Sequence, residues 1–144
     1  MRGFNRVFIA GYLGSDPELL HSRGGSTYAR LRVATTRSWL SGDASEVEEK
    51  TEWHRVVVWG RQAEICARHL RVGSALTVEG HLSSYRATSA SPAAALTGTE
   101  TGAPIFVSIV AERIHFLPRD RDQLPLQEPD AAPATLDKIA EAAK

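Results

Sequence analysis

Five stretches of the chain show the period of two that is typical of a strand, and the first of them is largely apolar on both faces. The stretches are residues 6–13, 27–37, 51–59, 75–83 and 105–117. Successive side chains of a strand point to opposite faces of a sheet, so this period predicts five β-strands. The alternation of the last stretch breaks at Glu112-Arg113, where we expect an irregularity in the strand. The chain is therefore expected to fold as an all-β domain.

A different period, typical of a helix, appears between the third and fourth predicted strands. Its apolar positions, spaced i, i+3, i+4 and i+7, are Ala63, Cys66, Ala67 and Leu70. This spacing places them on one side of a helix, and Gly73 is a natural stop beyond it. On such a stripe Cys66 is expected to be a small buried hydrophobe and a poor candidate for a nucleophile.

The segments between these elements differ in composition. Residues 14–26 are broken by Gly and Pro and are predicted to be a surface loop ending in a turn. Residues 84–104 are rich in Ser, Thr, Ala and Gly, and connections of that length are often functional or disordered. From Pro118 onward the chain is charged and interrupted by proline, so it cannot bury a core. We expect one domain over 1–117 and a mostly disordered tail over 118–144.

Composition adds limits on the function. No apolar run approaches the roughly 20 residues that cross a bilayer, so we expect a soluble intracellular protein without a membrane partner. One cysteine and five scattered histidines predict neither a disulfide framework nor a metal site, and we expect no cofactor. The net charge is zero, which is a weak signal for a nucleic-acid binder, although 14 of the 17 basic residues are arginine, the better residue for phosphate and stacking.

The third predicted strand carries two indoles around a guanidinium. Trp53, Arg55, Val57 and Trp59 share one face of it. One interpretation is ordinary sheet packing, with Arg55 reaching solvent. The other is a platform on which unstacked nucleobases lie while arginine contacts phosphates. The residues of this strand alone leave both open.

The preceding strand extends the same surface. Arg30 and Arg32 project from its outer face, opposite Ala29, Leu31 and Val33. Five strands with one helix between the third and fourth match the OB-fold, a small partly open barrel that binds oligonucleotides across its second and third strands. The sequence therefore predicts an OB-fold barrel whose binding face carries arginine and tryptophan.

Several motifs of the chain resemble those of bacterial single-stranded DNA-binding proteins. They are Asn5-Arg6-Val7, Gly11-Tyr12-Leu13-Gly14-Ser15-Asp16-Pro17-Glu18, Ala34-Thr35 with Trp39, Thr51-Glu52-Trp53-His54-Arg55-Val56-Val57-Val58, Leu70-Arg71-Val72-Gly73-Ser74 and Val78-Glu79-Gly80. The similarity covers residues 4–117. It implies sequence-independent binding and protection of single-stranded DNA in replication, recombination and repair, by a cytoplasmic, nucleoid-associated homotetramer.

The resemblance and the strand faces together give a set of candidate residues. The candidate DNA-binding residues are Arg30, Arg32, Trp39, Trp53, Arg55, Trp59, Arg61, Tyr85 and Arg86. The candidate oligomer-interface residues are Val7 and His54. In the family, the positions of Trp39, Trp53 and Trp59 face DNA bases, with Phe more usual at the last of them.

The chain also departs from the family pattern. Ala87 occupies a position where the family often has another Trp, and Tyr85 is expected to substitute in part. The acidic, Phe-ended tail tip with which the family recruits replication and repair enzymes is absent from the end of this sequence, which leaves recruitment of such partners open.

Two other classes of function compete with DNA binding. An enzyme would need a recognisable nucleophile, a P-loop or a zinc pair, and the sequence contains none of these motifs. An OB-fold that serves as a protein-interaction or specialised replication-accessory module, with weak DNA binding, is favoured mildly by the zero net charge and by Ala87. We expect a DNA-binding protein and not an enzyme.

Overall fold

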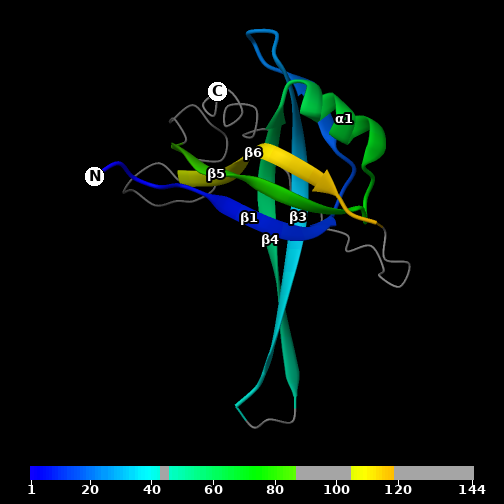
Figure 1. The fold of residues 1–144 in the computed structure, drawn as a ribbon. Helices are drawn as coiled ribbons and strands as arrows, with labels where there is room; N and C mark the ends of the chain where they lie inside the picture. The colour runs from blue at the N-terminus through cyan, green and yellow to red at the C-terminus, as the bar shows by residue number, and fades with distance from the viewer. Residues whose placement is uncertain (43–45, 87–104, 119–144) are drawn as a thin grey trace, which may run out of the picture.

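The computed structural model describes residues 1–42, 46–86 and 105–118. Its elements are β1 (Val7–Leu13), β2 (Glu18–His21), β3 (Thr27–Leu40), β4 (Val47–Trp59), α1 (Arg61–His69), β5 (Ala75–Arg86) and β6 (Ile105–Phe116) (Figure 1). Most of the predicted long connection, and the predicted tail beyond Pro118, lie outside these residues. No helix in the described part of the chain is long and apolar enough to cross a membrane.

Five of the strands close into a barrel. The sheet order is β1-β5-β6-β4-β3-β2, and a further pairing of β1 with β3 at Tyr12↔Ala34 and Leu13↔Val33 joins the two ends of the barrel. The β4–β6 pairing is parallel and the other pairings are antiparallel. Helix α1 lies between the third and fourth strands of this barrel. The predicted OB-fold is thereby confirmed.

The short strand β2 was not predicted. Residues 18–21 were expected to belong to a surface loop, but they pair antiparallel with β3, from Glu18↔Arg30 to His21↔Thr27. Four residues are too few for a period of two to stand out from a loop, particularly just after Pro17. Strand β2 lies outside the barrel and extends the sheet beyond β3.

The core is formed by the inward positions of the strands and the apolar stripe of α1. Its buried members are Leu13, Ala29, Leu31, Val33, Val56, Val58, Ala63, Cys66, Leu70, Leu76, Val78, Ile109 and Ala111. The predicted inward face of residues 27–37 and the predicted helical stripe both contribute to it. Cys66 is 1% exposed, and burial raises the pKa of its thiol to about 11, so it is protonated and unreactive at neutral pH, as predicted.

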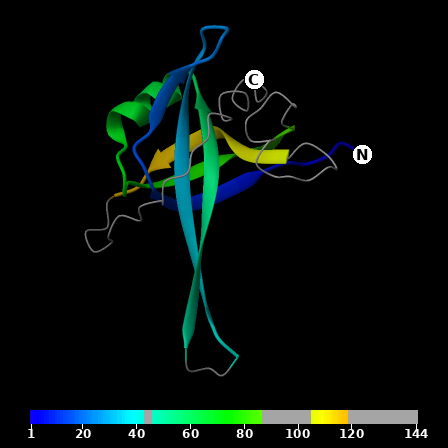
Figure 2. The same cartoon turned by 180° about the vertical axis from the view of Figure 1, so that it is seen from behind.

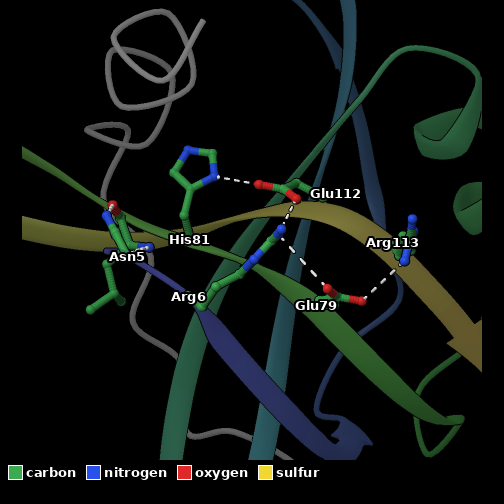
Figure 3. Close-up of polar contacts among 7 residues, drawn as sticks. Asn5, Arg6, Glu79, His81, Glu112 and Arg113 are labelled. Carbon is green, nitrogen blue, oxygen red and sulfur yellow. Dashed lines mark hydrogen bonds and ion pairs between the residues drawn. The ribbon is translucent and has the colours of Figure 1, made fainter. Parts of the chain in front are cut away.

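The predicted irregularity in the last strand is a β-bulge. Glu79 pairs with Arg113 and Gly80 with Ala111, which leaves Glu112 as the extra residue of β6. A side chain at Gly80 would collide with the backbone of Val110, so only glycine fits there. The bulge brings Glu112 into a polar cluster on the outer face of β1, β5 and β6 (Figure 3).

That cluster consists of alternating charges. Arg6 is paired with Glu112 and lies 3.7 Å from Glu79, which in turn is 3.7 Å from Arg113. His81 Nδ1 lies 3.1 Å from Glu112 Oε1. The hydrogen bonds from His81 and then Arg6 lower the pKa of Glu112. The cluster thereby links the start of β1 to β5 and β6.

Strands β3 and β4 are longer than predicted and leave the barrel together as a two-stranded arm (Figure 2). Their pairing runs from Tyr28↔Trp59 to Leu40↔Val47. The alternation that predicted the strands ended at residue 37 in β3 and began at residue 51 in β4, because the residues of the arm are mostly polar and exposed.

Candidate nucleic-acid interface

A pocket forms where β4 and β6 separate. The two strands pair only from Val56↔Ile109 to Val58↔Ala111. Before Val56, β4 continues with β3 into the arm, while the first residues of β6 stay paired with β5. The open pocket between them has a volume of about 320 Å³ and is lined by Arg32, Trp53, His54, Arg55, Leu82, Val107, Ser108 and Ile109. We call this pocket the notch.

Trp53 reaches the notch from β4. It is half-buried and stands opposite Ala34 of β3. Its six-membered ring lies against Gly14, and a side chain on Gly14 would overlap that ring. The glycine just after β1 therefore sets how closely the indole can approach the barrel, and part of the ring is left accessible.

Two arginines face each other across neighbouring strands in the notch. Arg32 and Arg55 are direct cross-strand partners. Burial and, second, the charge of Arg55 lower the pKa of Arg32. Like charges directly opposite each other destabilise a sheet, and an anion held between two guanidiniums would offset that repulsion. This part of the face is suited to a phosphate.

Phe106 adds an aromatic ring that was not among the predicted site residues. The Arg55 guanidinium lies 5.7 Å from the centre of its ring, and Tyr85 of β5 pairs with it in register. Phe106 thus stands beside Arg55, and Tyr85 lies one strand farther away, on β5. The alternation of residues 105–117 contained the signal, because it placed Phe106 and Ser108 on the face opposite Val107 and Ile109.

Ser108 is the buried polar residue of the notch. It is 1% exposed, and its hydroxyl has no hydrogen-bond partner in the described part of the chain. Leaving a polar group buried and unpaired costs about 1–3 kcal/mol, so the position is unfavourable without a ligand or water.

The other end of the β4 face is covered. Trp59 packs on Tyr28, with ring centres 5.1 Å apart and planes tilted by 41°, beside Val57 and Leu20 of β2. Arg30 Nη2 lies 2.5 Å from Glu18 Oε2, also of β2. Trp53 and Trp59 share a face, as predicted, but about 20 Å of strand separates them, at about 3.3 Å per residue.

The remaining predicted DNA-binding residues lie farther out. Trp39 is on the arm, 39% exposed, with the Arg37 guanidinium 5.5 Å from its ring centre. Arg61 is the exposed first residue of α1, just beyond Trp59, and Arg86 is the exposed last residue of β5, paired with Ile105. The notch therefore gathers Arg32, Trp53 and Arg55, but not the whole predicted set.

The two predicted interface residues have different surroundings. Val7 packs against the core, whereas Phe8, its neighbour on β1, is 69% exposed. His54 is half-buried, its Nε2 lies 2.7 Å from Thr35 Oγ1, and it lines the notch. In the ranges that the structure describes, no group of three His, Cys, Asp or Glu residues is placed to hold a metal ion.

An OB-fold barrel with arginines and aromatic rings on its β3–β4 face defines the chain as a member of the oligonucleotide-binding class. The family model described as "Single-strand binding protein family" matches residues 4–103. The chain belongs to the single-strand binding protein family.

Solved structures agree with this membership. The chain is similar to a Plasmodium falciparum SSB in complex with ssDNA, at 23% identity and a TM-score of 0.67, over 82% of this chain and 98% of that one. It is also similar to the wild-type single-stranded DNA binding protein from Thermus aquaticus, at 28% identity and a TM-score of 0.63. That match covers 82% of this chain and 52% of the Thermus chain, so this protein spans about half of its length.

Proposed function

We propose that this protein binds single-stranded DNA without sequence preference and protects it during replication, recombination and repair. Membership of the single-strand binding protein family supports the binding, and proteins of this family are non-enzymatic. The observation that carries the proposal is the grouping of Trp53, Arg32, Arg55 and Phe106 around the notch. No step of the proposed role requires chemistry on the DNA.

The chemistry of these side chains suits a single strand. Unstacked bases present flat faces that lie on aromatic rings, and every base has such a face, so stacking is tolerant of sequence. The two opposed guanidiniums favour the phosphates, and cation–π contact adds to this attraction. A paired duplex hides its base faces and would leave the rings without a partner.

The proposal is tested by titrating the intrinsic tryptophan fluorescence with oligo-dT at two salt concentrations. Stacking on Trp53 should quench the emission. The affinity should also fall as salt rises: for each phosphate neutralised, log Kd should increase by about 0.7 for every tenfold rise in salt concentration. No quenching, with the fold intact by circular dichroism, would support the alternative of an OB-fold protein-interaction module with weak DNA binding.

We also infer that the working form is a homotetramer of residues 1–117, with 118–144 outside its core. Strand β1 pairs with β3 only at its last two residues, so the backbone of Val7–Gly11 has one unpaired edge among the described residues. Phe8 and Phe4 are 69% and 88% exposed there. An open apolar edge is an aggregation hazard unless another chain covers it, which supports closed assembly. Under this proposal Val7 and His54 lie near the contact without forming it alone.

Light scattering tests the assembly and the role of the tail together. Both the full chain and a chain ending at Pro118 are expected to give the mass of a tetramer at micromolar concentration. A monomer from the full chain would contradict the assembly, and loss of the tetramer on truncation would show that the segment beyond Pro118 takes part in it.

A further inference from the structure

We propose that Asp16 is a positioning residue for Trp53, the indole that is expected to stack on DNA bases. Its carboxylate joins the loop of residues 14–17, which we call the support loop, to the turn of residues 71–74. Through the support loop, Asp16 fixes the surface on which the indole rests. The inference rests on the proposed function and deepens it, because Asp16 acts on binding without contacting the DNA.

Two of the sequence motifs shared with the family, one around the end of β1 and one after α1, meet in the fold. Leu13 N donates to Ser74 O at 2.9 Å, and Gly73 N donates to Leu13 O at 2.8 Å. These two bonds fasten the end of β1 to the turn that follows α1. A third bond comes from the support loop, because Asp16 Oδ1 accepts from the Val72 N–H at 2.7 Å.

The turn of residues 71–74 is itself closely held. Ser74 N donates to Arg71 O, and Ser74 Oγ accepts from Arg71 N, both at 2.9 Å. Gly73 has a φ of 80°, which together with the bond from Ser74 to Arg71 is the pattern of a type II β-turn. The closing bond of such a turn does not use the N–H of its second residue, Val72. The carboxylate of Asp16 takes this donor and so ties the support loop to a fixed part of the protein.

The support loop reaches Trp53 through Gly14. Gly14 is buried, and its N–H donates to Arg32 O at 2.9 Å. A Cβ at Gly14 would stand 2.2 Å from Cζ3 of Trp53 and 2.8 Å from Cη2. The indole therefore rests directly on the backbone of Gly14 and cannot sink deeper. Because Gly14 is two residues from Asp16, a displaced support loop changes the surface beneath the ring.

Holding the indole before DNA arrives favours binding. A side chain that is mobile in the free protein loses rotamer freedom when a base stacks on it, and this loss weakens the affinity. A ring already placed by its support has less freedom to lose. Asp16 is exposed, so a direct repulsion between its charge and the phosphates is the competing explanation, and it predicts the opposite change in affinity.

The first experiment compares Asp16 variants of the full-length protein by two readouts. One is the anisotropy of a labelled oligo-dT, and the other is the indole N–H resonance of Trp53, assigned by its loss in Trp53→Phe. Asp16→Ala should shift this resonance and weaken binding about three-fold, the low end of what one hydrogen bond contributes. Asp16→Asn keeps an oxygen acceptor and should restore both readouts. Ser15→Ala, at the exposed neighbouring position, is the matched control and should change neither.

The second experiment removes the donor instead of the acceptor. Val72→Pro lacks the N–H, and proline is common at the second position of a type II turn, so the turn should persist. This variant keeps the charge of Asp16 and should reproduce both effects of Asp16→Ala. Since the two changes break the same bond, the double variant should bind no more weakly than either single one. Additive losses would contradict the proposed contact.

Other outcomes overturn the proposal and show what replaces it. A lower urea midpoint for Asp16→Ala, with an unchanged Trp53 resonance and an unchanged Kd, would make Asp16 a structural residue only. Tighter binding by both Asp16→Ala and Asp16→Asn would assign it a charge effect. If the folded wild type does not bind oligo-dT, the proposed function fails separately, and the Trp53 resonance still decides whether Asp16 positions the indole. If Asp16→Ala does not fold, Val72→Pro decides it.

Discussion

The two ends of the outer β3–β4 face have similar residues and different surroundings. At one end Trp53 and the Arg32–Arg55 pair border the notch, where β4 has separated from β6. At the other end Trp59 packs on Tyr28, and Glu18 of β2 engages Arg30. The first end is open to a ligand, and the second is occupied by the protein itself.

The difference shows that a shared strand face is not the same as a shared function. Alternation places Trp53 and Trp59 on one side of β4, but it does not say what lies above either of them. The four residues of β2 cause the difference between the two ends, because they bring Leu20 and Glu18 over the second end. We therefore expect the open end to contribute mainly to DNA binding and the covered end mainly to stability.

The largest expected effect is that of Trp53→Ala on DNA binding. Base stacking on an aromatic side chain is worth about 1–3 kcal/mol per base, a range typical of single-strand binding, and the variant should lose binding free energy in that range. Fluorescence anisotropy of a labelled oligo-dT measures it without relying on tryptophan emission. Trp53→Phe keeps a ring and should recover most of the affinity. An unchanged Kd for the folded alanine variant would remove Trp53 from the interface.

Trp59→Ala should reverse the pattern. Because the indole packs on Tyr28 and Val57, its removal should lower the free energy of unfolding by about 1–2 kcal/mol, a part of what full burial of such a side chain contributes. Urea denaturation gives the stability, and the anisotropy titration should show less loss of affinity than Trp53→Ala. A greater loss of affinity than for Trp53→Ala, at unchanged stability, would show that the covered end opens on binding.

Glu18→Gln tests whether the ion pair with Glu18 of β2 keeps Arg30 from contacting the DNA. The Arg30 side chain is 19% exposed and that of Glu18 58%, and glutamine keeps an oxygen that accepts from the guanidinium, so the fold should tolerate the change. The neutral variant leaves the guanidinium better able to contact a phosphate, and the slope of log Kd against log salt should steepen by about 0.7. Glu64→Gln, at an exposed position of α1, is the matched control and should leave the slope unchanged. An unchanged slope in both variants would mean that Arg30 does not reach the DNA.

The smallest effect concerns pH and a region away from both ends. The hydrogen bonds from His81 and Arg6 lower the pKa of Glu112, so its contribution to stability is present above the ordinary pKa of a glutamate. The contribution is lost as the pH falls through the lowered value. Thermal unfolding between neutral and acid pH should therefore decline less steeply in Glu112→Gln than in the wild type. Parallel curves would show that this exposed cluster adds nothing to stability.

The sequence predicted the barrel because its strands are long and one face of each is buried. It also predicted an irregularity at Glu112-Arg113, where the structure has a bulge. It did not predict β2, since four mostly exposed residues carry too little pattern, nor the arm, since both faces of a two-stranded arm are solvated. In the candidate site, Arg32 was predicted from the outer face of β3, and Trp53 and Arg55 were predicted from the face that they share on β4. The notch and Phe106 were not, because they depend on where β4 and β6 part, which is a property of two distant segments.

One contact at the start of β1 helps to fix the register in which β1 pairs with β5. The side-chain amide of Asn5 accepts from the Leu82 N–H at 2.9 Å and donates to the Leu82 carbonyl at 2.8 Å, as a backbone peptide would (Figure 3). Strand β1 is apolar on both faces, so its apolar pattern alone specifies the register against β5 only weakly. The amide of Asn5 removes that degeneracy, because it can complete both hydrogen bonds only when Val7 stands opposite Gly80.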